Sequence, residues 1–198
     1  GSEMCIRDRI TPYVTDKYML IDSSSRRNLE LVETLREKQK RGSLLWVLDK
    51  TRTAMGARLL RSYVEQPLID EEEINARLDA VEALTSQAMI REEIREYLRP
   101  VYDLERLVGR ISYQSANPRD LIAFKSSLQM LPYIKQLLNS FEGGALAQVQ
   151  EDLDPLEDLY QLVDAAIVDD PPYLMRDGGM IKDGYNAVSY THLTLPTI

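Results

Sequence analysis

The chain has one cysteine, Cys5, and one histidine, His192, among its 198 residues. Both lie near an end, in segments that are set aside below. The residues between them therefore offer no thiol nucleophile, no imidazole base, no disulfide and no Cys/His metal site. An interior without cysteine is compatible with a reducing compartment, and we expect a cytoplasmic protein.

Other signatures of function are missing from the sequence as well. No apolar run is long enough to span a bilayer. The sequence contains neither the G-x-x-x-x-G-K-[ST] loop nor the G-x-G-x-x-G turn, which cradle phosphates with glycine-rich backbone. The net charge of −8 argues against tight nucleic-acid binding by the domain as a whole.

The two ends of the chain look foreign to the rest. A short DNA sequence encodes residues that fit Met4 to Arg9, and its reverse complement encodes residues that fit Val188 to His192. Ends that one inverted DNA sequence can encode are typical of a sequencing adaptor read as protein. We therefore exclude residues 1–9 and 188–198 from the fold prediction, as one excludes a fusion scar, and treat 10–187 as one domain.

The interior is predicted to be mostly α-helical. Apolar residues recur every three or four positions along most of it, which is the spacing of one helix face. Side chains that can accept hydrogen bonds from a free first turn predict where helices begin: Asp22, Thr53, Asp70, Asp103, Asn117 and Asp154. Breaks are predicted near Ser86, at Pro100, at Pro132 and at Gly143-Gly144.

The segment from Gly42 to Leu68 is predicted to organise the fold. It contains the single tryptophan, Trp46, inside the apolar run Leu44 to Leu48, and a helical pattern follows and ends at Pro67. We expect this run to be an apolar plug that locks the neighbouring helices together.

Two short β elements are expected besides the helices. Residues Ile10 to Ile21 favour a short N-terminal strand. Residues Tyr173 to Asn186 contain the turn signal Asp177-Gly178-Gly179, which fits a small β-hairpin or an irregular connection. The predicted fold class is therefore mostly α, a multi-helix domain with a short N-terminal strand and a small hairpin near the C-terminal end.

Charge is unevenly distributed along the chain. Ten basic and four acidic residues lie between Arg26 and Arg61, against two basic and eleven acidic residues between Phe141 and Ala187. The densest cationic group comprises Arg36, Lys38, Lys40 and Arg41. It fits a phosphate-contacting patch or a solvated helix end whose cations offset the helix dipole, and we favour the helix end.

Paired carboxylates are the remaining candidates for chemistry. Asp152 with Asp154, and Asp169 with Asp170, could hold magnesium through oxygen ligands. Both pairs stand where a helix is predicted to start or stop, so we favour capping and turn roles. Among the aromatic residues, Phe124 and Phe141 are expected in the core or at a helix end rather than as platforms for base stacking. Tyr97 and Tyr102 fit a packed or an exposed position equally well.

Ordered short motifs across residues 10–187 resemble those of the MutS family of DNA mismatch repair proteins. They are Met19-Leu20-Ile21-Asp22 with Arg26-Arg27-Asn28-Leu29-Glu30-Leu31, Gly42-Ser43-Leu44-Leu45, Thr53-Ala54-Met55-Gly56, Asp103-Leu104-Glu105-Arg106, Pro118-Arg119-Asp120-Leu121, Arg176-Asp177-Gly178-Gly179 and Gly184-Tyr185-Asn186. No single motif is specific, but their order over nearly the whole interior is.

The resemblance implies the core, or lever, domain of that family, a helical part that joins an ATPase to a clamp closing over DNA. Residues 10–187 would be its first half, and the mismatch-reading domain, the clamp, the second half of the core and the ATPase would be missing. ATP and magnesium are then expected in the parent family but not in this chain. We expect no enzyme here, and no catalytic, cofactor-binding, metal-binding or nucleic-acid-binding residues.

The resemblance also implies partners. They are the other domains of the parent protein, mismatched DNA reached through those domains, and a second subunit, because the parent family is dimeric. The expected function is a structural relay in mismatch repair. The alternative is a stand-alone helical adaptor that binds other proteins.

Overall fold

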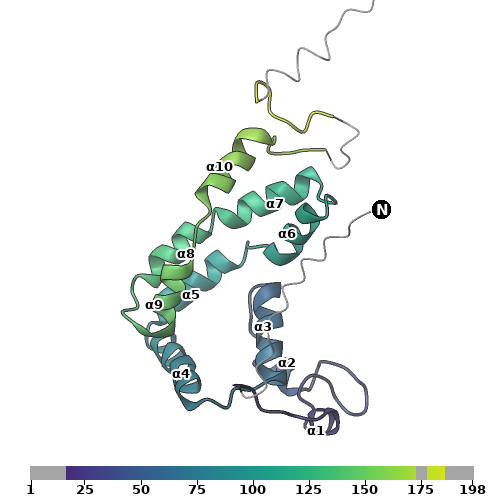
Figure 1. The fold of residues 1–198 in the computed structure, drawn as a ribbon, viewed down its shortest axis with the longest axis vertical. Coiled ribbons are helices and arrows are strands. Elements are labelled where there is room, and N and C mark those ends of the chain that lie inside the picture. The colour runs from purple at the N-terminus through teal and green to yellow at the C-terminus, as the bar shows by residue number, and fades with distance from the viewer. Residues whose placement is uncertain (1–16, 173–177, 186–198) are drawn as a thin grey trace, which may run out of the picture. The chain divides into compact units, whose positions relative to one another are not determined.

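The computed structural model describes residues 17–172 and 178–185 of the chain. Helices make up most of this part, and Figure 1 shows their order; a long loop, residues 29–43, separates the first two, and the other connections are short. They are α1 (Ser23–Asn28), α2 (Leu44–Leu48), α3 (Ala54–Glu65), α4 (Glu71–Ser86), α5 (Ala88–Leu98), α6 (Leu104–Ser112), α7 (Pro118–Leu128), α8 (Leu131–Leu138), α9 (Gly144–Asp152) and α10 (Glu157–Ala166). The predicted mostly α fold is confirmed. None of these helices is both long and apolar enough to cross a membrane.

The chain divides into two compact units, which are described separately. Unit 1 consists of Gly1–Asp49 and Leu59–Asn75, and unit 2 of Lys50–Arg58 and Ala76–Ile198. The division falls within α3 and within α4, so each of these helices contributes residues to both units.

Unit 1 has a small core built from loops and helix ends. Leu31, Leu45 and Leu68 are its buried apolar side chains among the described residues. The main-chain N–H of Leu45 donates to the carbonyl of Leu31 at 2.9 Å and fixes the start of α2 against the loop after α1. Of the predicted N-terminal strand, the described residues contain one antiparallel bridge, between Tyr18 and Leu68; residues 10–16 lie outside them.

The predicted apolar plug is not packed as expected. Ser43 caps α2 by accepting from the Trp46 N–H at 3.2 Å, and Leu45 is only 3% exposed. Trp46, however, is 47% exposed, and Leu44, Val47 and Leu48 are exposed as well. A helix of five residues makes little more than one turn, so the loop that it contacts covers one side chain of the run. The prediction that the plug locks the helices together is therefore wrong.

The basic group from Arg36 to Arg41 does not lie at a helix end. The helix predicted to begin after Asp22 and to reach this group ends at Asn28 instead. Glu30 then adopts a left-handed backbone with φ of 49°, which turns the chain out of the helix. The four cations occupy the loop that follows, and all four side chains are exposed.

Unit 2 contains two clusters of buried apolar side chains. In the first, Leu107 of α6 packs with Phe124 and Leu128 of α7, and residues of α10 cover them. In the second, Ile134 and Leu138 of α8 pack with Phe141, and residues of α4, α5 and α9 surround them. Phe124 and Phe141 are both buried, as predicted.

Five of the predicted helix caps are present. Side-chain oxygens of Asp22, Thr53, Asp70, Asp103 and Asn117 accept hydrogen bonds from first-turn N–H groups. Around Asn117 the full capping box forms, since Asp120 reaches back to the Asn117 N–H and Pro118 opens the helix. At Asp70 the carboxylate accepts from the Glu73 N–H at 2.8 Å, and the Glu73 carboxylate itself pairs with Lys17 at 2.6 Å.

The structure departs from the prediction toward the end of the chain. α9 was not predicted, and α10 begins two residues later than a cap at Asp154 implies. The Asp154 carboxylate instead accepts from the Leu156 N–H at 2.9 Å, and Leu156 takes a left-handed φ of 53° before the helix starts. Of the predicted hairpin, residues 173–177 lie outside the described part. The residues after it pair with the end of α10 through the antiparallel bridge Ile167–Ile181.

Candidate functional site

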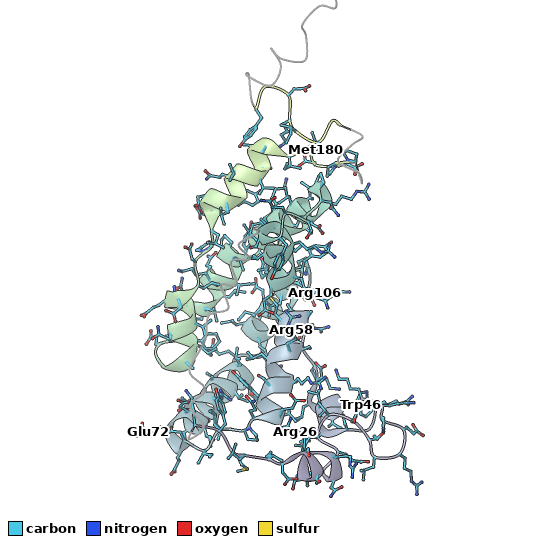
Figure 2. The ribbon with its side chains drawn as sticks, turned by 45° about the vertical axis from the view of Figure 1, so that its right-hand side comes forward. Arg26, Trp46, Arg58, Glu72, Arg106 and Met180 are labelled. Atoms are coloured by element: carbon cyan, nitrogen blue, oxygen red, sulfur yellow. The ribbon has the colours of Figure 1, made fainter. Side chains whose placement is uncertain are left out.

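The first candidate site is an ion-pair joint in unit 2 between the start of α3 and the start of α6. Arg58 donates from Nη1 to Asp103 Oδ2 at 2.7 Å and from Nη2 to Asp103 Oδ1 at 2.8 Å. The same Nη2 also contacts the Glu105 carboxylate. Figure 2 labels Arg58 together with Arg106, whose N–H is capped by Asp103. We call these residues the Arg58 joint.

Electrostatics in the Arg58 joint favour the charged forms of Arg58 and Asp103. The Arg58 guanidinium holds the pKa of Asp103 below its ordinary value, and the bond from the Arg106 N–H acts in the same direction. The two carboxylates raise the pKa of Arg58 in turn. A planar guanidinium that grips both carboxylate oxygens fixes an angle as well as a distance. The joint can therefore hold two helix ends in a defined orientation.

The second candidate site is centred on Lys125 of α7. Its ammonium donates to Asp164 of α10 at 3.0 Å and to Asp169 beyond α10 at 2.9 Å. The Lys125 side chain is only 12% exposed, so water solvates its charge poorly and the two carboxylates take over that role. The pKa of Lys125 is raised, first of all by Asp169, and the pKa of Asp169 is lowered by Lys125. We call this cluster the Lys125 hub.

The structure engages three of the four predicted magnesium-binding carboxylates in other contacts. Asp152 accepts from Gln148 at 3.1 Å, Asp154 holds the turn at Leu156, and Asp169 belongs to the Lys125 hub. An ammonium beside Asp169 opposes a second cation there. Over residues 17–172 and 178–185, no three His, Cys, Asp or Glu side chains gather in a geometry that could hold a metal ion.

Three contacts of unit 2 could not be assigned from the sequence. Tyr97 stacks on Tyr133 with ring centroids 5.1 Å apart, whereas Tyr102 is exposed. The Ser127 hydroxyl is fully buried, accepts from the Tyr102 N–H at 2.9 Å and donates to the Ala123 carbonyl at 2.8 Å. A serine within an otherwise apolar helix face was the available signal for this contact.

The basic group leads to a third site, in unit 1. Lys38 and Lys40 line a pocket of about 570 Å³ together with Arg26 and Arg27 of α1 and Arg61 of α3. Arg36 and Arg41 are not part of its lining. The sequence pattern could not predict this pocket. Its lining comes from α1, from the loop after α1 and from α3, and these segments meet only in the folded chain.

Taken together, these elements define a helical structural domain whose helix ends are tied by charged side chains. Comparison with known proteins identifies it further. The sequence model described as MutS domain III matches residues 24–193. The chain belongs to the MutS family of DNA mismatch repair proteins, as the sequence motifs indicated.

Curated relatives give the same result. The chain is 66% identical over 177 residues to the DNA mismatch repair protein MutS of Lachnoclostridium phytofermentans, a match that covers 89% of this chain and 19% of the relative. It is 55% identical over 178 residues to the protein of the same name from Ruminiclostridium cellulolyticum, covering 90% of this chain and 20% of that relative. The chain thus spans about a fifth of the length of the curated relatives that it matches.

Proposed function

We propose that this chain serves as a structural relay, one part of a longer mismatch repair protein that passes a movement from one domain to another. It would carry out no reaction by itself. Membership of the MutS family supports a place in a mismatch repair protein. The observation that supports a relay mechanism is the Arg58 joint. Backbone hydrogen bonds lie within each helix, so a helix moves as a rod, and a relay needs rods whose ends are held at fixed angles.

The relay would have its partners within the parent protein. In the family, the resemblance implies an ATPase on one side and a DNA clamp on the other, with ATP and magnesium bound by the ATPase. Mismatched DNA and the second subunit of a dimer would then be reached through those domains. The contacts of the described residues support a structural role, since carboxylates among them serve as a helix cap, in an ion pair and in a turn.

The experiment breaks a joint and measures coupling in a full-length protein. Residues 24–187 of this chain would replace the matching part of the Lachnoclostridium phytofermentans relative, with Arg58→Gln as the variant and Arg52→Gln as the control. Arg52 is an exposed arginine outside the joint, so the control removes the same charge. The readout is the factor by which mismatched DNA changes the rate of ATP hydrolysis.

We expect the variant to lose the coupling between DNA binding and ATP hydrolysis while keeping each of the two activities. Arg58→Gln should reduce the effect of DNA on hydrolysis, while hydrolysis without DNA and the affinity for DNA stay close to the control. A double variant that removes the Arg58 joint and the Lys125 hub, Arg58→Gln with Lys125→Gln, should reduce the effect of DNA on hydrolysis further. Coupling unchanged in this double variant would contradict the relay.

A stand-alone adaptor is the second candidate, and the exposure of Trp46 and its neighbours favours it. Sequencing the uninterrupted gene distinguishes the two. A reading frame that continues into a clamp and a phosphate-binding loop supports the relay, and a stop soon after residue 187 supports the adaptor.

A further inference from the structure

We propose that the basic pocket of unit 1 is a binding site for a phosphate-bearing anion. The pocket is lined by five cationic side chains and two acidic ones in a chain whose net charge is −8. We call it the Arg26 pocket; its cations are Arg26, Arg27, Lys38, Lys40 and Arg61. This site is separate from the Arg58 joint and the Lys125 hub, and the inference does not depend on the relay.

Two of the five cations are already neutralised by ion pairs. Lys40 pairs with Asp49 at 2.5 Å, and Arg61 pairs with Glu65 at 3.1 Å. Arg26, Arg27 and Lys38 form no ion pair with any of the described residues. Glu33 is the one acid of the lining without an ion pair to the described residues, so these three cations leave an excess of positive charge in the pocket. An anion placed between them would relieve their mutual repulsion.

Arg26 has hydrogen-bond donors that the protein does not use. The one hydrogen bond that its guanidinium makes to the described residues runs from Nη2 to the Ile21 carbonyl and is long, at 3.4 Å. Its Nε is shielded from water and has no acceptor. Buried donors are nearly always satisfied in folded proteins, so an orphaned one calls for a missing partner. Arg26 belongs to α1 and is labelled in Figure 2, and its side chain is part of the pocket lining.

The lining also selects the chemistry of the anion. Val32 is its one apolar side chain, and no aromatic ring contributes. A nucleobase would find no aromatic ring to stack on, and a peptide would find little apolar surface to bury against. Guanidinium groups and ammonium groups do bind phosphate oxygens strongly, arginine through paired N–H bonds. A volume of about 570 Å³ exceeds the need of a single phosphate and suits a ligand with two or more.

The test titrates the purified chain with inorganic pyrophosphate by calorimetry, with the NMR signals of the arginine side chains as a second readout. The variants are Arg26→Gln and Lys38→Gln, and Arg36→Gln is the control, since Arg36 is an exposed cation of the same loop outside the lining. Lys38 is exposed, so its replacement tests the site even where loss of Arg26 disturbs the fold. Each pocket variant should weaken binding by about tenfold, and the control should not.

A second arm distinguishes the sources of phosphate. A short single-stranded DNA would be titrated under the same conditions, and the Arg26 side-chain signal followed. Displacement of pyrophosphate by DNA at a lower phosphate concentration assigns the site to a nucleic-acid backbone, and failure to displace it assigns the site to a free phosphate compound. Equal binding by wild type and both pocket variants overturns the proposal. So does tighter binding of a glutamate-rich peptide than of either phosphate source.

Discussion

Asp103 binds Arg58 through both carboxylate oxygens and at the same time caps the first turn of α6. The two residues are 45 positions apart in the sequence. The same carboxylate therefore joins the first turn of α6 to Arg58 of α3. One side chain thus caps a helix and links its start to another helix.

The first prediction separates the two roles of Asp103. Asp103→Asn keeps an effective cap and loses the ionic bond to Arg58, whereas Asp103→Ala loses both. We expect Asp103→Ala to lower the free energy of unfolding by about 1 kcal/mol more than Asp103→Asn, the usual worth of a cap. Urea titrations followed by circular dichroism measure the difference. Equal losses in the two variants would contradict the capping role.

The same pair predicts a dependence on pH. Because the pKa of Asp103 is lowered in the folded chain, its ionic contribution is present above the pKa of the unfolded chain. That contribution is lost as the pH falls through the lowered pKa. The stability difference between wild type and Asp103→Asn should therefore be full at pH 7 and shrink toward zero in strong acid. A difference that stays constant between these limits would exclude the ion pair as its cause.

A third prediction concerns the core of unit 2. Leu128 is 1% exposed between Leu107 and Phe124, so Leu128→Ala should lower the free energy of unfolding by about 2–5 kcal/mol through lost burial and a residual cavity. Leu162→Ala makes the same change at a side chain that is 53% exposed, and should cost far less. Similar urea midpoints for the two variants would show that the cluster does not stabilise the unit.

The Lys125 hub gives a prediction at both ends of the pH range. Asp169 has a lowered pKa, so its contribution is present above the unfolded pKa and disappears as the pH falls through the folded one. Lys125 has a raised pKa, so its contribution is present below its unfolded pKa and disappears as the pH rises through the folded value. Lys125→Gln should flatten both limbs of the stability profile. Persistence of both limbs in that variant would assign them to other groups.

Much of the fold could be predicted because helix signals are local. The caps at Thr53 and Asn117 depend on residues three positions away, and the break at Pro132 follows from the proline ring itself. α7 ends at Leu128, and α8 begins at Leu131 with Pro132 in its first turn, as such a signal requires.

The wrong predictions concern properties that the local pattern does not determine. Trp46 was expected to be buried because its neighbours in the sequence are apolar. Burial depends on what packs against a helix, and among the side chains of the short helix α2 only Leu45 is buried. The Arg58 joint and the Lys125 hub link residues some forty positions apart, and nothing in the sequence pairs them. The Arg26 pocket likewise exists only once α1 and α3 are in place.

The last prediction follows from the exposure of Trp46 and applies to the purified chain. The described residues include exposed apolar side chains in α2, in α3 and in α4, among them Trp46, Leu59 and Val81. Apolar surface of this extent favours association or marginal stability.

Trp46 is the only tryptophan, so its fluorescence reports on α2 alone. At low concentration we expect emission at long wavelength and ready quenching by iodide, because the ring is 47% exposed. Raising the concentration should shift the emission to shorter wavelength and protect it, in step with a larger sedimentation coefficient. Val47→Lys, which charges the neighbouring exposed position, should suppress both changes. A chain that stays monomeric, keeps a shielded Trp46 at every concentration and melts cooperatively at high temperature would show that this surface is covered from within.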